Sequence, residues 1–283
     1  MKSLILPLAI LGGLAIALIA GTGALLVVNG SFSASPEEPS TKAGKPTTPA
    51  KTVKRDDLKP DSLPEVPQAS GKSKLKELNK EKTLYIETME DGTKKLHVAA
   101  EVCLREGVLL EVLLCKKQTK EHEAILRIDL DAKLLHAGLV AIGAKPGSPV
   151  QFVNPKTEQP EYKPASGTVI DIDVHYSRDG KPQSHKAQDW IIDKSTKKAM
   201  AHDWVFAGSR FVKWPDKPDE PEYYCANNGE VIAVSNFVDS MLDLPVQLSG
   251  SDDELTFEAD YTKVPAVGSM VWVTLSPRAE KKK

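Results

Sequence analysis

The chain has 283 residues, a formal net charge of −2 and 41% hydrophobic residues. A chain this close to neutral lacks the basic patch expected of a nucleic-acid-binding protein, so we expect no nucleic-acid partner. Its length allows one or two domains. Its three cysteines are fewer than the four that iron–sulfur clusters typically require.

The N-terminal segment, residues 1–28, has the composition of a membrane anchor. Residues 4–28 carry no charge, and at 1.5 Å per residue they would form a helix of about 37 Å, longer than a bilayer core of about 30 Å. Lys2 precedes this run and the first charges after it are acidic, which places the N-terminus in the cytoplasm. We therefore expect a single-pass cell-membrane protein with an extracytoplasmic C-terminal domain. The alternative is a cleaved signal peptide and a secreted or periplasmic protein.

The remainder divides by composition into a linker, a folded domain and a tail. Residues 29–82 are rich in proline, serine, threonine and charge, and predict a disordered linker. At its end, residues 72–82 predict a short polar helix. The folded domain is predicted over 83–277, followed by a basic tail at 278–283.

Three turn signals in the domain predict β-hairpins. Asp91-Gly92 lies between strand-like runs, Asp179-Gly180 follows the alternating run 168–176, and Asn227-Asn228-Gly229 precedes another apolar run. Residues 188–192 and 202–206 resemble one another and predict an antiparallel pair with Trp190 and Trp204 in the core. His97, on the first hairpin, is expected to be a half-exposed strand residue.

The run from 108 to 115 is apolar except for Glu111, which is typical of a strand buried on both faces. If residues 123–129 pair with it through a four-residue loop, Cys115 lies opposite Lys120. Faces alternate with period two, so Glu111, Cys115, Lys120 and His122 would then share one face. An unpaired carboxylate in such a strand is costly, which makes this cluster the candidate site.

The strongest helix signal covers residues 132–142. Asp131 can cap its N-terminus, apolar residues recur at helical spacing, and Gly143 can end it. The fold class predicted from all these elements is α+β, mainly antiparallel sheet built from hairpins, with this one principal helix.

Several motifs resemble those of the YdjY-type domain family. The resemblance covers most of the folded part, roughly 95–277. It rests on Gly107, Glu111, residues 120–123, the helix with His136, and the segments 143–147, 204–209 and 241–245. The family is essentially uncharacterised, so the resemblance implies a fold and no activity.

Function is open between three readings. The first is a tethered binding or structural module of the cell envelope, with a protein or glycan partner. The second is a metal or redox site built on Glu111, Cys115 and His122, with His136 added, which would suit zinc. The third is a hydrolase that uses Glu123 or His122 as its base. The cysteines (Cys103, Cys115 and Cys225) are either buried thiols or contain one disulfide pair.

Overall fold

The computed structural model describes residues 59–107, 109–154, 156–248 and 256–279, which belong to one compact unit, 53–283. Within these ranges no helix has the length and apolar content needed to cross a bilayer, and the expected anchor at 1–28 lies outside them.

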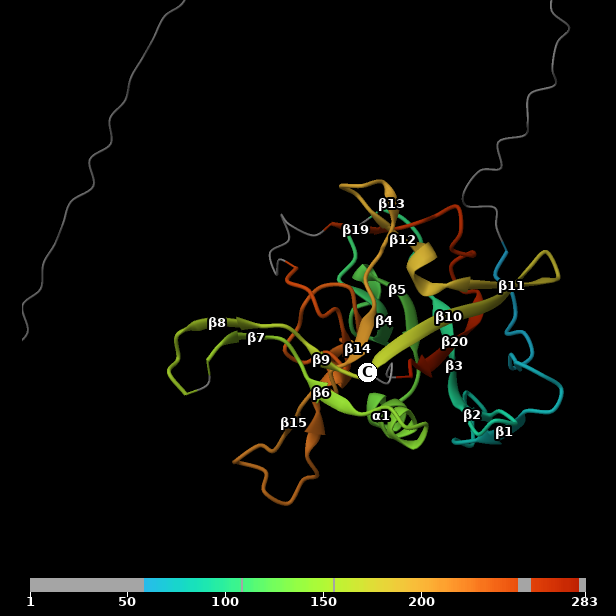
Figure 1. Ribbon diagram of the computed structural model, residues 1–283. Coiled ribbons are helices and arrows are strands. Elements are labelled where there is room, and N and C mark those ends of the chain that lie inside the picture. Colours follow the sequence, from blue (N-terminus) through green and yellow to red (C-terminus); the bar gives the residue numbers. More distant parts are fainter. Residues whose placement is uncertain (1–58, 108, 155, 249–255, 280–283) are drawn as a thin grey trace, which may run out of the picture. The chain divides into compact units, whose positions relative to one another are not determined.

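A closed β-barrel organises the described residues (Figure 1). Eight strands follow one another around the ring, each paired with the next, and the last pairs with the first. In ring order they are β3 (Lys94–Val102), β20 (Met270–Pro277), β10 (Val169–Arg178), β14 (Trp204–Phe206), β18 (Leu242–Asp243), β17 (Ile232–Ala233), β4 (Val112–Lys116) and β5 (Ala124–Ile128). Closure removes the open sheet edges of these strands. The α+β prediction is therefore wrong, because the domain is mainly β with a single α-helix among the described residues.

Two hairpins were predicted correctly because local turn chemistry specifies them. β2 (Leu84–Thr88) pairs with β3 across Asp91-Gly92, and β11 (Lys181–Lys186) pairs with β10 across Asp179-Gly180. Gly92 and Gly180 both have positive φ, the conformation that such turns need.

The helix α1 (Ala132–Ala141) is confirmed as predicted, to within one residue. The Asp131 side chain accepts a hydrogen bond from the Lys133 amide at the N-terminus, and Gly143 follows the C-cap with φ +94. Gly138 lies against Leu96 of β3, with no room for a Cβ, so glycine lets the helix approach the barrel closely.

The central hairpin was predicted wrongly. β4 and β5 lie parallel, with Cys115 opposite Arg127, because residues 117–123 carry the chain back to the start of β4 before β5 begins. Within this connection η2 (Glu121–Glu123) forms one 3-10 turn. The shared face deduced from antiparallel pairing therefore does not exist.

Two further pairings were also wrong. β12 (Ile191–Asp193) pairs with β13 (Lys198–Ala199) and β19 (Phe257–Ala259) rather than with β14. Trp190, in η3 (Ala187–Trp190), and Trp204 are nevertheless fully buried, as expected.

Asn227-Asn228 lies in η4 (Cys225–Asn228) and makes no hairpin turn. The Asn227 side chain instead accepts a hydrogen bond from the Ala132 amide and donates one to Asp131, so it is committed to the start of α1.

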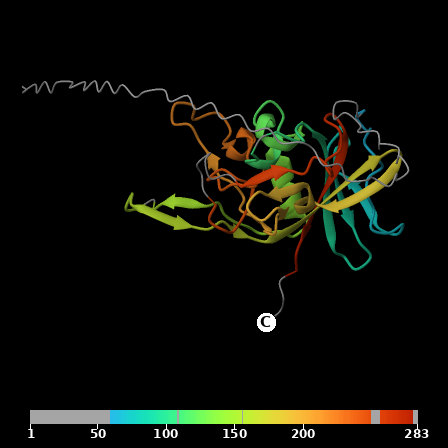
Figure 2. The same ribbon diagram turned by 90° about the horizontal axis from the view of Figure 1, so that it is seen from above.

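Two hairpin arms project from the barrel (Figures 1 and 2). The long arm, residues 146–167, pairs β6 (Pro146–Ser148) with β9 (Ser166–Gly167) at its base and β7 (Gln151–Val153) with β8 (Pro160–Lys163) further out. The short arm pairs β15 (Phe211–Val212) with β16 (Tyr223–Tyr224).

The described residues include a stretch that precedes the predicted domain boundary at residue 83. β1 (Lys74–Glu77) pairs with β2 where a polar helix was predicted. Residues 60–73, which precede β1, lie against the outside of the barrel and are called the strap here. Trp272 of β20 donates its indole N–H to the Pro64 carbonyl of the strap at 2.9 Å.

Candidate functional site

Glu111 belongs to a cluster of three carboxylates around one lysine. Lys120 Nζ lies 2.6 Å from a Glu111 oxygen and 3.4 Å from both Glu123 and Glu230. It also lies 4.2 Å from the centre of the Phe237 ring. The four charged side chains are between 11% and 21% exposed. Glu111 is thus a satisfied ion-pair partner, which is the structural alternative to a metal ligand.

The surplus of negative charge determines the protonation of this cluster. Burial opposes the charge of Lys120, but its hydrogen bond to Glu111 and the nearby carboxylates outweigh that effect and raise the pKa of the lysine. Burial and the adjacent Glu111 raise the pKa of Glu123. One Glu230 oxygen is buried without a hydrogen-bond partner. Lys120 is therefore a fixed cation, and Glu123 is the group best suited to exchange a proton.

Replacing Lys120 by Met is expected to lower the free energy of unfolding by about 2 kcal/mol at pH 7. Removing one partner of a buried ion pair costs about 3–5 kcal/mol, and partial exposure reduces that cost here. The loss should shrink below about pH 5, where the carboxylates take up protons. Urea unfolding from pH 4 to 8 measures it. Lys117→Met is the control, because that lysine pairs with exposed Asp129 and its loss should change stability by less than about 0.5 kcal/mol.

The other predicted site residues lie elsewhere. His122 is 77% exposed and lies 3.8 Å from Glu123. Cys115 is buried, and His136 is on α1. Among the described residues, no group of three or more His, Cys, Asp and Glu side chains is placed to hold a metal ion. Zinc binding by these four residues stays a prediction, which native mass spectrometry of zinc-dosed protein and its Glu111→Gln variant tests.

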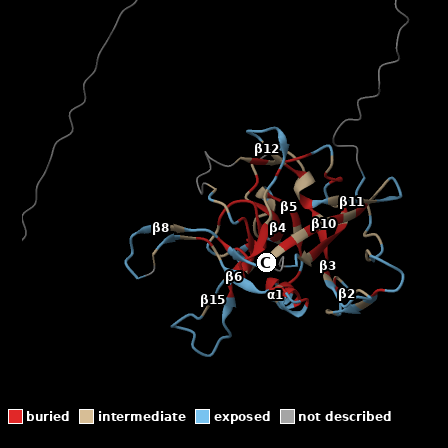
Figure 3. Ribbon diagram, in the orientation of Figure 1, coloured by how far each residue is buried: buried red, intermediate tan, exposed pale blue. Residues whose placement is uncertain are grey.

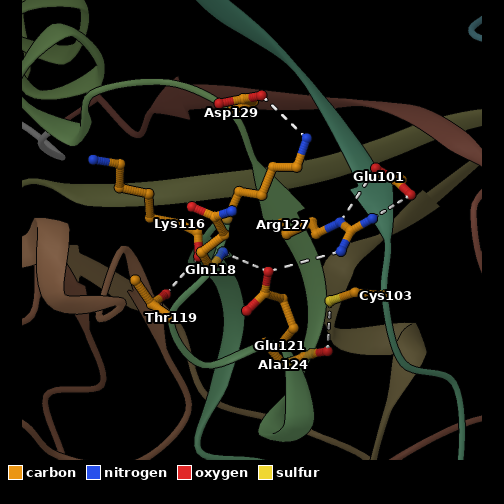
Figure 4. Close-up of polar contacts among 10 residues, drawn as sticks. Glu101, Cys103, Lys116, Gln118, Thr119, Glu121, Ala124, Arg127 and Asp129 are labelled. Carbon is orange, nitrogen blue, oxygen red and sulfur yellow. Dashed lines mark hydrogen bonds and ion pairs between the residues drawn. The ribbon is translucent and has the colours of Figure 1, made fainter.

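Cys115 lies beside a second thiol. Its pKa is lowered by the Cys103 thiol, against the opposing effect of burial, while that same contact and burial raise the pKa of Cys103. Cys103 Sγ donates to the Ala124 carbonyl at 3.1 Å (Figure 4). All three cysteines are free thiols in this structure.

An ion-pair group lies beside the Cys103 thiol (Figure 4). Arg127 forms a forked pair with Glu101, at 2.7 and 3.2 Å, and lies 3.7 Å from Glu121. Arg127 and its two carboxylate partners thus satisfy one another's charges.

His136 lies where the two arms leave the barrel. Its Nδ1 lies 2.8 Å from the hydroxyl of Tyr224, which donates to the Gly208 carbonyl at 3.1 Å. The Tyr224 hydroxyl has a single proton and donates it to Gly208, so the hydroxyl oxygen accepts from His136. The Nδ1 atom of His136 therefore carries a proton in this arrangement. Burial lowers the pKa of His136, and Phe206 packs edge-on against its ring. The histidine is a neutral packing element that joins α1 to the base of the short arm.

Two glycines let the arm bases pack together. Gly208 has φ +91, and a Cβ on it would lie 2.8 Å from Pro146 of the long arm. Gly167 has φ +141, and a Cβ on it would lie 2.0 Å from the Phe206 carbonyl oxygen. Both positions need glycine for backbone conformation and for space. The motifs around 143–147 and 204–209 therefore meet in space as a structural joint.

A pocket of about 380 Å³ runs beside the long arm. The consecutive residues 148–153 line one side, and Arg210 and Val238 line the other. Arg210 is already paired with Asp239. The wall of this pocket therefore includes all three residues of β7.

A buried acid lies under the same arm. Asp243 of β18 is fully buried, and burial raises its pKa to about 7 despite hydrogen bonds from Asn236 and the Leu244 amide. One of its oxygens has no hydrogen-bond partner, and neither has the buried hydroxyl of Tyr162 on β8. The ring of Tyr162 contacts Phe152, which lines the pocket.

Five of the ten large apolar side chains exposed among the described residues lie on the two arms, which are largely exposed (Figure 3). These five are Phe152, Val153, Phe211, Trp214 and Tyr223. Leu134 and Val140 lie on α1, Val238 lines the pocket, and Tyr261 and Val267 lie elsewhere. This surface was not identified from the sequence. The only signal was the apolar run 149–153 at the edge of a proline-rich stretch.

A model of the YdjY domain matches residues 88–276, which confirms the resemblance. Searches of curated proteins and of solved structures gave no match. The matched segment contains the barrel, α1 and both arms, while the strap and β1 precede it. The chain therefore belongs to the YdjY domain family.

Proposed function

We propose that this protein is a membrane-tethered, extracytoplasmic binding module, and that it holds an extended segment of a partner protein of the cell envelope along β7. The observation that carries the proposal is the pocket beside β7, in which Phe152, Val153 and Val238 are all exposed. Exposed apolar groups that line one pocket are typical of an interaction site.

The two edges of the long arm differ in a way that supports this proposal. Among the described strands β7 pairs only with β8, so each has one open edge. The β8 edge contains Pro160, Glu161 and Lys163, which are residues that block strand addition. The β7 edge, Gln151–Val153, has no charge and no proline. Main-chain hydrogen bonding to such an edge is a common mode of peptide recognition.

A photo-crosslinking residue in place of Val238 tests the proposal in cells that express the full chain. The expected product joins position 238 to one envelope protein through an extended segment, identified by mass spectrometry. Phe152→Asp should abolish it, because a charge on the open edge opposes strand addition. Val267→Asp, at an exposed apolar position away from the arms, should leave it intact. Crosslinks to glycan or lipid alone, or crosslinks that survive Phe152→Asp, would contradict the proposal.

An acid–base enzyme is the second candidate, and the raised pKa of Glu123 beside exposed His122 favours it. A carboxyl group with a raised pKa can donate and accept a proton near neutral pH. Screening the wild type and Glu123→Gln against chromogenic esters and glycosides tests it. Activity that is absent in both, or equal in both, would remove this candidate.

A further inference from the structure

A buried polar network lies on the outside of the barrel, beneath the strap. Glu87 of β2 and His97 of β3 are each only 1% exposed. His97 Nε2 lies 3.2 Å from Glu87, and Nδ1 lies 2.8 Å from the hydroxyl of Thr274. Sequence reasoning expected a half-exposed histidine on an outer face, and that expectation is wrong. A second layer of protein covers this face.

The strap binds directly to this network through Glu87. The Ala69 amide and the Ser73 hydroxyl donate to the same oxygen of Glu87, at 2.7 and 2.5 Å. Nearer the N-terminus, Asp61 exchanges hydrogen bonds with residues 269 and 270, just before and at the start of β20. Leu63 and Val66 pack, partly buried, against the outer-face cluster that contains Trp272.

The strap has no fully buried apolar residue. Of residues 60–73, only Ser73 is buried. Docking therefore combines partly buried apolar contacts of Leu63 and Val66 with hydrogen bonds, and two of these hydrogen bonds end on one Glu87 oxygen. A segment held in this way opens more easily than the barrel strands beneath it.

We propose that residues 60–73 form an acid-released strap, and that the Glu87–His97 pair beneath it senses pH. In the docked state His97 is neutral, with Nε2–H donating to Glu87 and Nδ1 accepting from Thr274. Releasing the strap admits water, which stabilises the imidazolium that forms when His97 takes a proton from solvent. Docking and protonation therefore oppose one another.

The charged groups around His97 either favour release of the strap as the pH falls or keep the same charge throughout. Burial lowers the pKa of His97 to about 4, although Glu87 opposes this, and His175 and Lys95 add to the lowering. Burial also lowers the pKa of His175, which faces Asp173 and Lys186 as well. Burial opposes the charge of Glu87, but Ser73, Ala69 and His97 together lower its pKa. Glu87 and His97 thus both gain protons when the strap leaves.

The expected pH window follows from His97. Its pKa in the docked state is lowered from 6.5 to about 4, so docking is strongest above pH 6.5 and weakens as the pH falls towards 4. Within this window one proton taken up on release changes the release constant by about tenfold per pH unit. A released strap would also lengthen the predicted tether by up to roughly 45 Å, at about 3.3 Å per residue.

Hydrogen–deuterium exchange of the full chain in detergent micelles, between pH 7.5 and 4.5, tests the proposal. After correction for intrinsic exchange, the opening constant of the Ala69 amide should rise about tenfold per pH unit below 6.5, while β20 amides stay protected. His97→Gln should reduce this slope to less than threefold per unit. His122→Gln, at an exposed histidine, should keep it.

Ser73→Ala provides a second variant that leaves the barrel intact. It should raise the opening constant at every pH and keep the slope, because it removes a strap bond and no titrating group. Protection of β20 amides reports whether each variant is folded. A wild-type strap whose opening does not change with pH would overturn the proposal. So would a slope that persists in folded His97→Gln.

Discussion

Replacing Asp243 by Asn is expected to stabilise the domain by about 4 kcal/mol at pH 8 and to change little at pH 4. The pKa of the buried carboxyl is raised from 3.8 to about 7, so the native state holds this proton more tightly than the unfolded chain does. Stability from this group is full below pH 3.8 and is lost as the pH rises to 7. The difference between the two pKa values, about three pH units, corresponds to about 4 kcal/mol.

The substitution is well matched to its surroundings. An Asn oxygen can accept the hydrogen bonds that Asn236 and the Leu244 amide now make to one carboxyl oxygen. The other oxygen has no partner to lose. Urea unfolding followed by the fluorescence of the buried tryptophans measures the change. Asp129→Asn, at an exposed carboxylate, is the control and should not alter the pH dependence. An Asp243→Asn variant that is less stable than wild type at pH 8 would refute a buried, uncompensated charge.

The sequence was informative wherever a few neighbouring residues decide the structure. Asp91-Gly92 and Asp179-Gly180 specify tight turns, and Asp131 with Gly143 specifies both ends of α1. These signals depend on backbone conformation and capping, which act within a turn of the chain.

It failed where partners distant in the sequence decide the structure. Strands joined by a short connection are expected to be antiparallel, so the parallel pair β4–β5 contradicts the usual pattern. Asn227 has the composition of a hairpin turn, but bonds to the start of α1 instead. Closure of the barrel through β3 and β5 follows from neither strand alone.

In the candidate site, too, features that depend on neighbouring residues were predicted and features that depend on distant partners were missed. Glu111 was singled out as a carboxylate that needs a partner, and Lys120, which pairs with it while both stay partly exposed, was among the residues expected near it. Glu230 completes the cluster from more than a hundred residues away, and no local pattern indicates it. The groove at β7 and the strap over His97 were missed because each depends on one segment lying against another.

His97 and Asp243 should impose opposite pH dependences on stability, and each should become visible when the other is removed. The pKa of His97 is lowered to about 4, so its contribution is lost as the pH falls from 6.5 to 4, by about 3 kcal/mol. The contribution of Asp243 to stability is instead lost as the pH rises from 3.8 to 7. In the wild type the two slopes should nearly cancel between pH 4 and 6.5.

Four proteins measured by urea unfolding test this cancellation. Relative to wild type, Asp243→Asn should gain about 3 kcal/mol of stability between pH 4 and 6.5, and His97→Gln should lose a similar amount over the same range. The double variant should follow the wild-type slope, since the two residues lie on different strands, share no hydrogen-bond partner and should act additively. If the strap is released before the barrel unfolds, the stability lost through protonation of His97 cannot exceed the free energy of strap docking. The curve of stability against pH would then level off near pH 5. Such a plateau would connect the urea measurement with the hydrogen-exchange measurement. Single variants whose pH slopes equal that of the wild type would mean that neither group titrates as its burial requires.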